Sequence, residues 1–225
     1  MPIGVRDVNR GLGQLLWPTL RARGFEDRTQ RAAWRRREDG VDVVEIQSIG
    51  PSYDSVGCTS FSFTAYVAAL IYWAVPPESQ RDGKTGSRPH YWNCEPLVHQ
   101  LNKRLHQPWF RPFTRPPEKL SEPMRLHQEA LKRVFRTDVH DRPDVWFVLE
   151  DGTNLDQDLR DLAAVVREDG LAILERFHNP EEVIQMATKG ELRTAPESPA
   201  SQRVVEAALA RLGQRSGEAS WLIPG

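Results

Sequence analysis

The clearest hydrophobic pattern lies in the only long stretch without a charged residue, Val56 to Pro77. In its first half, hydroxyl-bearing side chains alternate with phenylalanine, alanine and valine, which is the period of two of a β-strand. Its second half is apolar on both faces, as in a strand that is covered on both sides. Pro76 and Pro77 then end the pattern, because proline has no N–H to donate to a sheet. These features predict a strand within Thr59 to Val75.

An amphipathic helix is predicted at the start of the chain. From Val5 to Arg23 apolar residues recur every three or four positions, which gives a helix one apolar face. Pro18 should kink this helix or separate its last turn. Gly24 follows as a C-terminal cap, after which Phe25 returns to the core.

Two short strands and a longer one are predicted between this helix and the uncharged stretch. The short strands are Phe25 to Arg28 and Ala32 to Arg37, and Asp39-Gly40 is a typical hairpin turn. The β-branched run from Val41 to Ile49 is predicted to be the returning strand. Together with Thr59 to Val75, these strands form an antiparallel meander.

The second half of the chain is predicted to be mainly helical. The expected elements are a short helix through Leu97 to Leu105, an irregular proline-rich segment at Pro108 to Pro117, a helix over Ser121 to Phe135, a strand at Val145 to Leu149, and helices from Asn154 to Gly170, from Asn179 to Met186 and from Ser198 onward. The whole pattern predicts an α+β domain over residues 1–190. It has a mainly antiparallel four- or five-stranded sheet, with an N-terminal helix and C-terminal helices packed on it. Residues 191–225 follow as a C-terminal helical extension.

Composition places the chain among ordinary globular proteins of the cytoplasm. Its 225 residues are 39% hydrophobic and 27% charged, with a formal net charge of −1. Two cysteines, Cys58 and Cys94, are too few for a disulfide framework, so a reducing compartment is expected. The N-terminus has no apolar signal core. A membrane helix needs about 20 predominantly apolar residues, and the hydroxyl-rich half of the uncharged stretch does not meet that requirement, so no membrane partner is expected.

The order of these features resembles an uncharacterised bacterial family catalogued as domain of unknown function 4304. The resemblance covers roughly residues 5–189. The matching residues are Leu20 to Phe25, Trp34-Arg35-Arg36, Val43 to Gln47, Phe61 to Thr64, Trp146, and Gly170 to Phe177. It implies an α+β domain and transfers no catalytic residue, because the family has no established activity. By analogy, some small bacterial domains of this kind act as immunity or antidote proteins beside toxins.

The most unusual charge feature is an arginine-rich segment around Trp34. One interpretation is contact with nucleic acid, with arginines on phosphates and the indole stacked on a base. The other is a solvated hairpin with a buried tryptophan. The segment contains Arg21, Arg23, Arg28, Arg31, Arg35, Arg36 and Arg37.

Exposed arginine together with aromatic residues is also the composition of protein-interface hot spots. A second aromatic element lies in the proline-rich segment. The predicted partner-binding residues are therefore Arg28, Trp34, Arg35, Arg36, Arg37, Trp109, Phe110 and Phe113.

Catalytic chemistry has weaker support. Glu45 and Gln47 share a strand face, as in a metal-dependent nuclease, although polar alternation on a half-exposed strand explains them equally well. The six histidines lack metal-ligand spacing, and Cys94 has no His partner with an orienting third group. No phosphate-binding loop or G-x-S-x-G motif is present.

We therefore predict no catalytic residue, metal or cofactor. The favoured function is a non-enzymatic cytoplasmic domain that binds another protein, with an immunity or antidote role as its most specific form. The alternative is a nucleic-acid-binding or metal-dependent nuclease-like protein that uses the basic hairpin.

Overall fold

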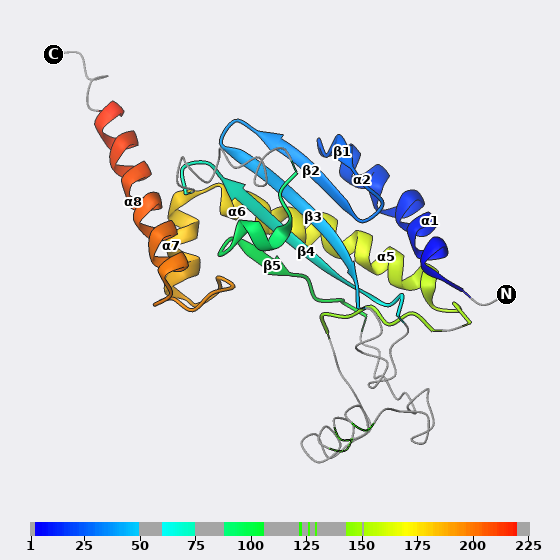
Figure 1. Ribbon diagram of the computed structural model, residues 1–225. Helices are drawn as coiled ribbons and strands as arrows, with labels where there is room; N and C mark the ends of the chain where they lie inside the picture. The colour runs from blue at the N-terminus through cyan, green and yellow to red at the C-terminus, as the bar shows by residue number, and fades with distance from the viewer. Residues whose placement is uncertain are drawn as a thin grey trace. The chain divides into compact units, whose positions relative to one another are not determined.

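A computed structural model describes residues 3–49, 60–74, 88–105, 122, 126, 129, 143–149 and 151–219 of the chain (Figure 1). The elements up to the last strand are α1 (Val5–Leu15), α2 (Trp17–Arg21), β1 (Asp27–Arg28), β2 (Ala32–Arg37), β3 (Gly40–Ser48), β4 (Phe63–Ile71), the 3-10 helix η2 (Tyr91–Cys94) and β5 (Val98–Gln100). The helices that follow are α5 (Leu155–Val165), the π-helical turn η4 (Val166–Gly170), α6 (Leu171–Phe177), α7 (Pro180–Thr188) and α8 (Pro199–Ala219).

The strands form one five-stranded sheet in the order β1-β2-β3-β4-β5. The pairs β1 with β2, β2 with β3, and β4 with β5 are antiparallel. Helices precede the sheet at the N-terminus and follow it at the C-terminus, so the predicted α+β fold is confirmed. The chain divides into two compact units. Within the strands, the boundaries between the units fall after Glu45 in β3 and after Ala65 in β4. Unit 1 comprises residues 1–19, 46–65 and 101–166, and unit 2 comprises residues 20–45, 66–100 and 167–225.

In unit 1, helices α1 and α5 pack closely at Gly11. A side chain at this position would collide with Leu159 of α5, so glycine permits the helices to approach. Val8 and Leu12 on α1 are buried, as is Leu162 on α5. These residues belong to the periodic apolar positions that predicted the two helices. The N-terminal helix ends at Leu15 and restarts as α2 at Trp17. This break confirms the effect expected of Pro18.

The segment around Trp146 corrects a prediction in unit 1. Residues 145–149 were expected to form a strand, but only an isolated bridge joins Trp146 to Phe63. Neighbouring backbone groups are satisfied by side chains instead of by a strand, since Val148 N–H donates to Ser62 Oγ at 3.0 Å and Leu149 N–H donates to Asn154 Oδ1 at 2.9 Å. An apolar run alone does not show where its backbone hydrogen bonds will go.

In unit 2, the sheet has two faces of different chemistry. One face is an apolar core in which alternate residues of β2, β3, β4 and β5 pack with Tyr91 and Cys94 of η2. The opposite face carries Arg35, Arg37 and the buried Asp42, which contact Glu175 and His178 at the end of α6. The apolar core contains Ala32, Trp34, Val41, Val43, Tyr66, Ala68, Leu70, Tyr91, Cys94 and Val98.

Two predicted turns of unit 2 are confirmed. Gly24 has a φ of 87°, its N–H donates to Arg21 O at 3.1 Å, and Phe25 N–H donates to Leu20 O at 3.2 Å. This is the Schellman cap that glycine permits at a helix C-terminus. The turn between β2 and β3 is equally tight, with Arg37 directly opposite Gly40.

One predicted helix is wrong. The region from Leu97 to Leu105 contains strand β5, in which Val98 pairs with Ala68. Leu97 and Leu101 are both buried, as the helix prediction required. These leucines are four positions apart, and this spacing places side chains on one side of a strand as well as of a helix. The spacing therefore could not distinguish the two structures.

The later helices agree with their start signals. Asn179 caps α7 by accepting from Glu181 N–H at 3.0 Å, and α8 begins at Pro199. Helix α7 packs beside α8 (Figure 1), and Val183 and Val204 are buried on them. Gly170 does not end a helix as predicted, because its φ of −62° continues the chain into α6 through the π-helical turn. The predicted elements at Pro108 to Pro117 and, except for three positions, at Ser121 to Phe135 lie outside the described residues.

Gly40 provides a test of the hairpin geometry. A methyl group at this position would collide with the backbone oxygen of Leu70 and with Ile71. Because the obstacle is backbone, we expect Gly40→Ala to lower the free energy of unfolding by about 1–3 kcal/mol. Chemical denaturation measures this loss.

Gly13→Ala is the matched control, because Gly13 lies on α1 with no atom within 4 Å of an added methyl group. Alanine favours a helix by about 1 kcal/mol over glycine, so this variant should be as stable as the parent or more stable. Equal effects of the two substitutions would contradict the close contact at Gly40.

Candidate functional site

The arginines of the β2–β3 hairpin point to alternate faces of the sheet, and those on one face are neutralised. Arg35 Nε and Arg37 Nε donate to Asp42 Oδ2 at 2.7 and 2.8 Å. Arg35 also donates to Glu175 Oε1 at 2.9 Å, and Arg37 donates to the same oxygen. The two guanidinium groups therefore join the hairpin to α6.

His178 completes this ion-pair network. Its Nε2 lies 2.7 Å from Asp42 Oδ1, and its Nδ1 lies 2.8 Å from Asp39 Oδ1. The carboxylate of Asp42 is fully buried, so its two oxygens are satisfied by three cationic side chains and not by water. A buried carboxylate is tolerated when it is paired and hydrogen-bonded in this way.

The network shifts the pKa of both central groups toward their charged forms. Burial by itself lowers the pKa of His178, but hydrogen bonds and charge attraction from Asp42 and Asp39 raise this pKa above its ordinary value of 6.5. Burial likewise raises the pKa of Asp42, but His178, Arg35 and Arg37 lower it to below its ordinary value. The network therefore favours the imidazolium form of His178 and the carboxylate form of Asp42.

Trp34 is not exposed as an interface anchor would be. Its side chain lies in the apolar core with 4% exposure, and its indole N–H donates to Pro89 O at 2.8 Å. Arg88 covers the ring, with its guanidinium carbon 5.5 Å from the ring centroid, and pairs with Asp27 at 2.6 Å. This finding corrects the expectation that Trp34 would present an aromatic surface, because its strand position faces the core.

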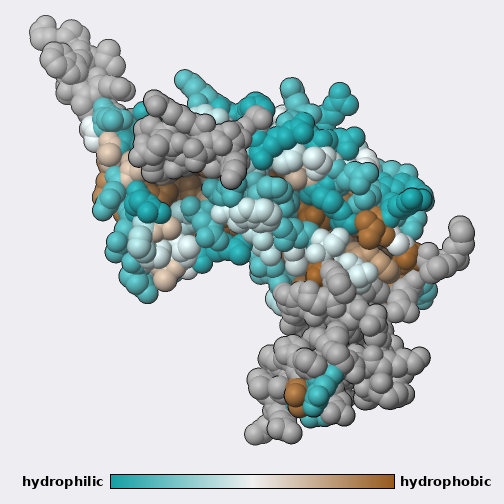
Figure 2. All heavy atoms as spheres, viewed as in Figure 1, coloured by the Kyte–Doolittle hydropathy of each residue, from teal (hydrophilic) through white to brown (hydrophobic). Residues whose placement is uncertain are grey.

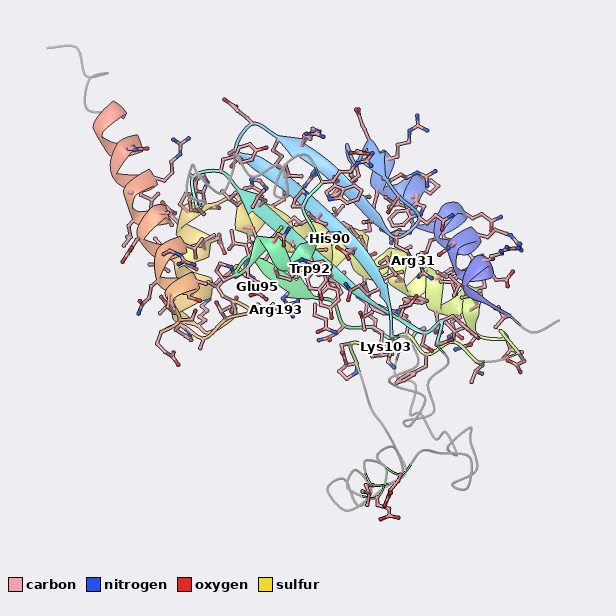
Figure 3. All side chains as sticks on the ribbon, in the orientation of Figure 1. Arg31, His90, Trp92, Glu95, Lys103 and Arg193 are labelled. Carbon is pink, nitrogen blue, oxygen red and sulfur yellow. The ribbon has the colours of Figure 1, made fainter. Side chains whose placement is uncertain are left out.

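The exposed aromatic side chain of this region is Trp92 in η2. It is 49% exposed and stacks on His90, with ring centroids 4.3 Å apart and an interplanar angle of 8° (Figure 3). His90 Nδ1 lies 3.4 Å from a carboxylate oxygen of Glu45, and the same oxygen accepts from Tyr91 N–H at 3.3 Å. These contacts fix the backbone and one side of the exposed stack.

Two buried tyrosines, Tyr66 and Tyr91, pack next to the stack of His90 and Trp92. The rings of Tyr66 and Tyr91 are parallel, with centroids 4.1 Å apart. The guanidinium of Arg193 lies 5.3 Å from the Tyr91 ring centroid and pairs with Glu95 at 3.2 Å. Figure 3 labels Glu95 and Arg193 beside His90 and Trp92. Trp92 is therefore an exposed aromatic residue whose neighbouring residues are fixed by packing and by ion pairs.

Two grooves run beside the hairpin and meet at Glu26. The larger, of about 650 Å³, is lined by Gly24, Glu26, Asp27, Trp34, Arg35 and Arg36. The smaller, of about 480 Å³, is lined by Arg21, Phe25, Glu26 and Arg28. The side chains of Arg21, Arg28 and Arg36 are exposed, so each groove has a cationic wall that can accept an anionic group.

The structure thus divides the predicted partner-binding residues into three groups. Arg28 and Arg36 are exposed and line grooves, whereas Arg35 and Arg37 are held in the ion-pair network and Trp34 is buried. Trp109, Phe110 and Phe113 lie outside the described residues. Sequence reasoning missed Trp92, His90 and His178. The aromatic run His90-Tyr91-Trp92, directly after Pro89, was the available signal for the first two.

Two other buried titratable groups, Cys94 and Asp158, contribute to the packing and hydrogen bonding of the fold. Burial raises the pKa of the Cys94 thiol, which opposes a nucleophilic thiolate. In unit 1, burial raises the pKa of Asp158 to about 7, and its carboxylate accepts from Asn154 Nδ2 at 2.8 Å. Asn154 in turn binds the backbone of Phe147 and Leu149, so this acid helps to hold a loop against α5. Within the described part of the chain, no three histidine, cysteine or acidic side chains are grouped as metal ligands.

No protein-family model matches the sequence, and no curated protein or solved structure is significantly similar to it. The resemblance to domain of unknown function 4304 stays a prediction. In the described ranges, no helix is long and apolar enough to cross a membrane.

The ion-pair network predicts a pH-dependent contribution to stability. Because the pKa of His178 is raised on folding, its contribution is complete below pH 6.5 and is lost as the pH rises through the folded-state pKa. We expect His178→Gln to destabilise the protein most near pH 6 and least near pH 9. Denaturation with urea across this range measures the difference between the variant and the parent protein.

His99→Gln is the control, since burial lowers the pKa of His99 and its linkage has the opposite sign. A destabilisation by His178→Gln that is constant from pH 6 to pH 9 would contradict a charged His178 in the network.

Proposed function

We propose that this protein is a non-enzymatic protein-binding domain of the bacterial cytoplasm. Its contact surface, which we name the Trp92 surface, consists of Arg88, His90, Trp92 and Arg193. The single observation that supports the proposal most strongly is the half-exposed indole of Trp92, which is stacked on His90. Its most specific form is an immunity or antidote role, in which the partner is a toxin protein.

The composition of the Trp92 surface is that of an interface hot spot. Tryptophan, tyrosine and arginine dominate such hot spots because each offers a large contact area together with polar groups. Stacking on His90 restricts the indole before binding, which lowers the conformational entropy lost on association. The ion pairs Arg88–Asp27 and Arg193–Glu95 provide the polar rim that surrounds interface anchors.

The surrounding surface also suits a small set of anchors better than a broad apolar contact. The face seen in Figure 2 is mostly hydrophilic, with small separate hydrophobic areas. A polar interface of this kind depends on a few well-held side chains for its affinity.

Nucleic acid fits this surface less well. The exposed acidic side chain of Glu26 lines both grooves beside the arginines. Trp34, whose ring was the expected stacking platform, is buried. Repulsion between Glu26 and a phosphate backbone favours a partner in which charges of both signs can be arranged.

Removal of the Trp92 side chain tests the surface. A tagged protein is used to capture its partner from the native cell with and without nuclease, and affinity for the identified partner is then measured by calorimetry. We expect Trp92→Ala to weaken binding about 30-fold, as a hot-spot residue does, because a loss of about 2 kcal/mol corresponds to that factor. The fold should be retained, since the side chain is half-exposed.

Leu209→Ala is the matched control, because Leu209 is an exposed apolar residue on α8 outside the Trp92 surface. Equal affinities of Trp92→Ala and the parent protein would overturn the proposal that the Trp92 surface binds the partner. Captured material that disappears on nuclease treatment would instead identify nucleic acid as the partner.

A further inference from the structure

The arginines near the hairpin differ in whether another side chain of the protein neutralises them. Arg35 and Arg37 share Asp42 and Glu175, and Arg88 pairs with Asp27. Arg21, Arg28 and Arg36 are exposed, and within the described residues no salt bridge holds them. These three arginines line the two grooves.

The unneutralised acids of the same region are fewer. Glu26 is exposed where the grooves meet, and Glu38 is exposed at the tip of the hairpin. Asp27, Asp39 and Asp42 are already paired with cations. The groove region thus carries excess positive charge on a protein whose formal net charge is −1. This local imbalance favours an anionic partner segment.

The position of the arginines indicates the conformation of that segment. Arg28 lies on β1 opposite Ala33, whereas Arg36 lies three residues further along β2 and points to the other face of the sheet. Strand β1 has only two residues and is the outer strand of the sheet. In an extended segment beside this edge, side chains three positions apart point to opposite sides, so acidic residues at positions i and i+3 match the offset and the faces of the two arginines.

We infer that an extended acidic segment of the partner protein lies along the β1 edge, with carboxylates paired to Arg28 and Arg36 and a third near Arg21. This inference rests on the proposed protein-binding function and specifies the chemistry of its partner. Glu26 repels a continuous run of acids at the junction of the grooves. The segment that fits best therefore carries two basic or neutral residues between its acidic residues.

A synthetic peptide tests this chemistry directly. The probe is a short fluorescein-labelled peptide in which two residues, lysine and threonine, separate two glutamates, and its binding to the full chain is followed by fluorescence anisotropy. We expect it to bind more tightly than a charge-reversed peptide and than a single-stranded oligothymidine of similar length. Its affinity should fall as salt is added, because the contacts are exposed ion pairs.

The double substitution Arg28→Glu with Arg36→Glu should weaken peptide binding about tenfold or more, since two attractive pairs become repulsive. The control is Arg203→Glu with Arg211→Glu on α8, which changes the net charge equally outside the grooves. If the first variant does not fold, Arg28→Gln with Arg36→Gln provides the same comparison without introducing repulsion.

The outcomes separate this inference from the proposed function. The inference of an acidic partner segment would be overturned if the charge-reversed peptide bound equally well. It would also be overturned if the α8 control lost as much affinity as the groove variant. Tighter binding of oligothymidine would assign the grooves to nucleic acid. A captured partner that depends on Trp92 but not on Arg28 or Arg36 would leave the protein-binding function in place and reject only the acidic segment.

Discussion

The fully buried carboxylate of Asp42 is the group on which the arginine hairpin depends. It accepts hydrogen bonds from Arg35, Arg37 and His178, and these groups come from one strand and from the end of α6. A buried charge is costly unless it is paired, so removal of any one partner leaves the others in an unfavourable site. The network therefore holds the hairpin and α6 of unit 2 in one arrangement and leaves these two arginines little freedom to contact a partner.

The geometry of the strand then decides which side chains remain for binding. Neighbouring residues of β2 point to opposite faces, so the face that brings Arg35 to Asp42 also places Trp34 in the apolar core. Arg36 is on the same face as Trp34, but it lies at the end of the strand and is exposed. A single run of arginines is thus divided into structural ion pairs and surface charges by the alternation of the strand.

The Trp92 surface is built around the same core. Tyr91 enters the apolar cluster and stacks on Tyr66, which places the next residue, Trp92, toward solvent. Pro89 accepts the indole N–H of Trp34, and His90 covers one face of Trp92. The buried tryptophan and the exposed one therefore depend on the same short segment, and the packing of the first determines how the second is presented.

Local sequence patterns were sufficient to predict the class of fold and many element boundaries. Periodic apolar residues located α1 and β4, Pro18 and Gly24 marked helix ends, and Asn179 and Pro199 marked helix starts, because these signals act through local backbone geometry. The sequence also located the arginine hairpin. It could not separate a helix from a strand at Leu97 and Leu101, since the two periods coincide at a spacing of four residues.

The availability of the candidate side chains at the surface depends on contacts between distant parts of the chain. Asp42 and His178 are 136 positions apart in the chain, and no local pattern relates them. Their contact neutralises Arg35 and Arg37, and the contact of Trp34 with Pro89 removes the expected aromatic anchor from the surface. Residue type is a property of one position, whereas exposure and charge neutralisation depend on residues that folding brings together from distant parts of the chain.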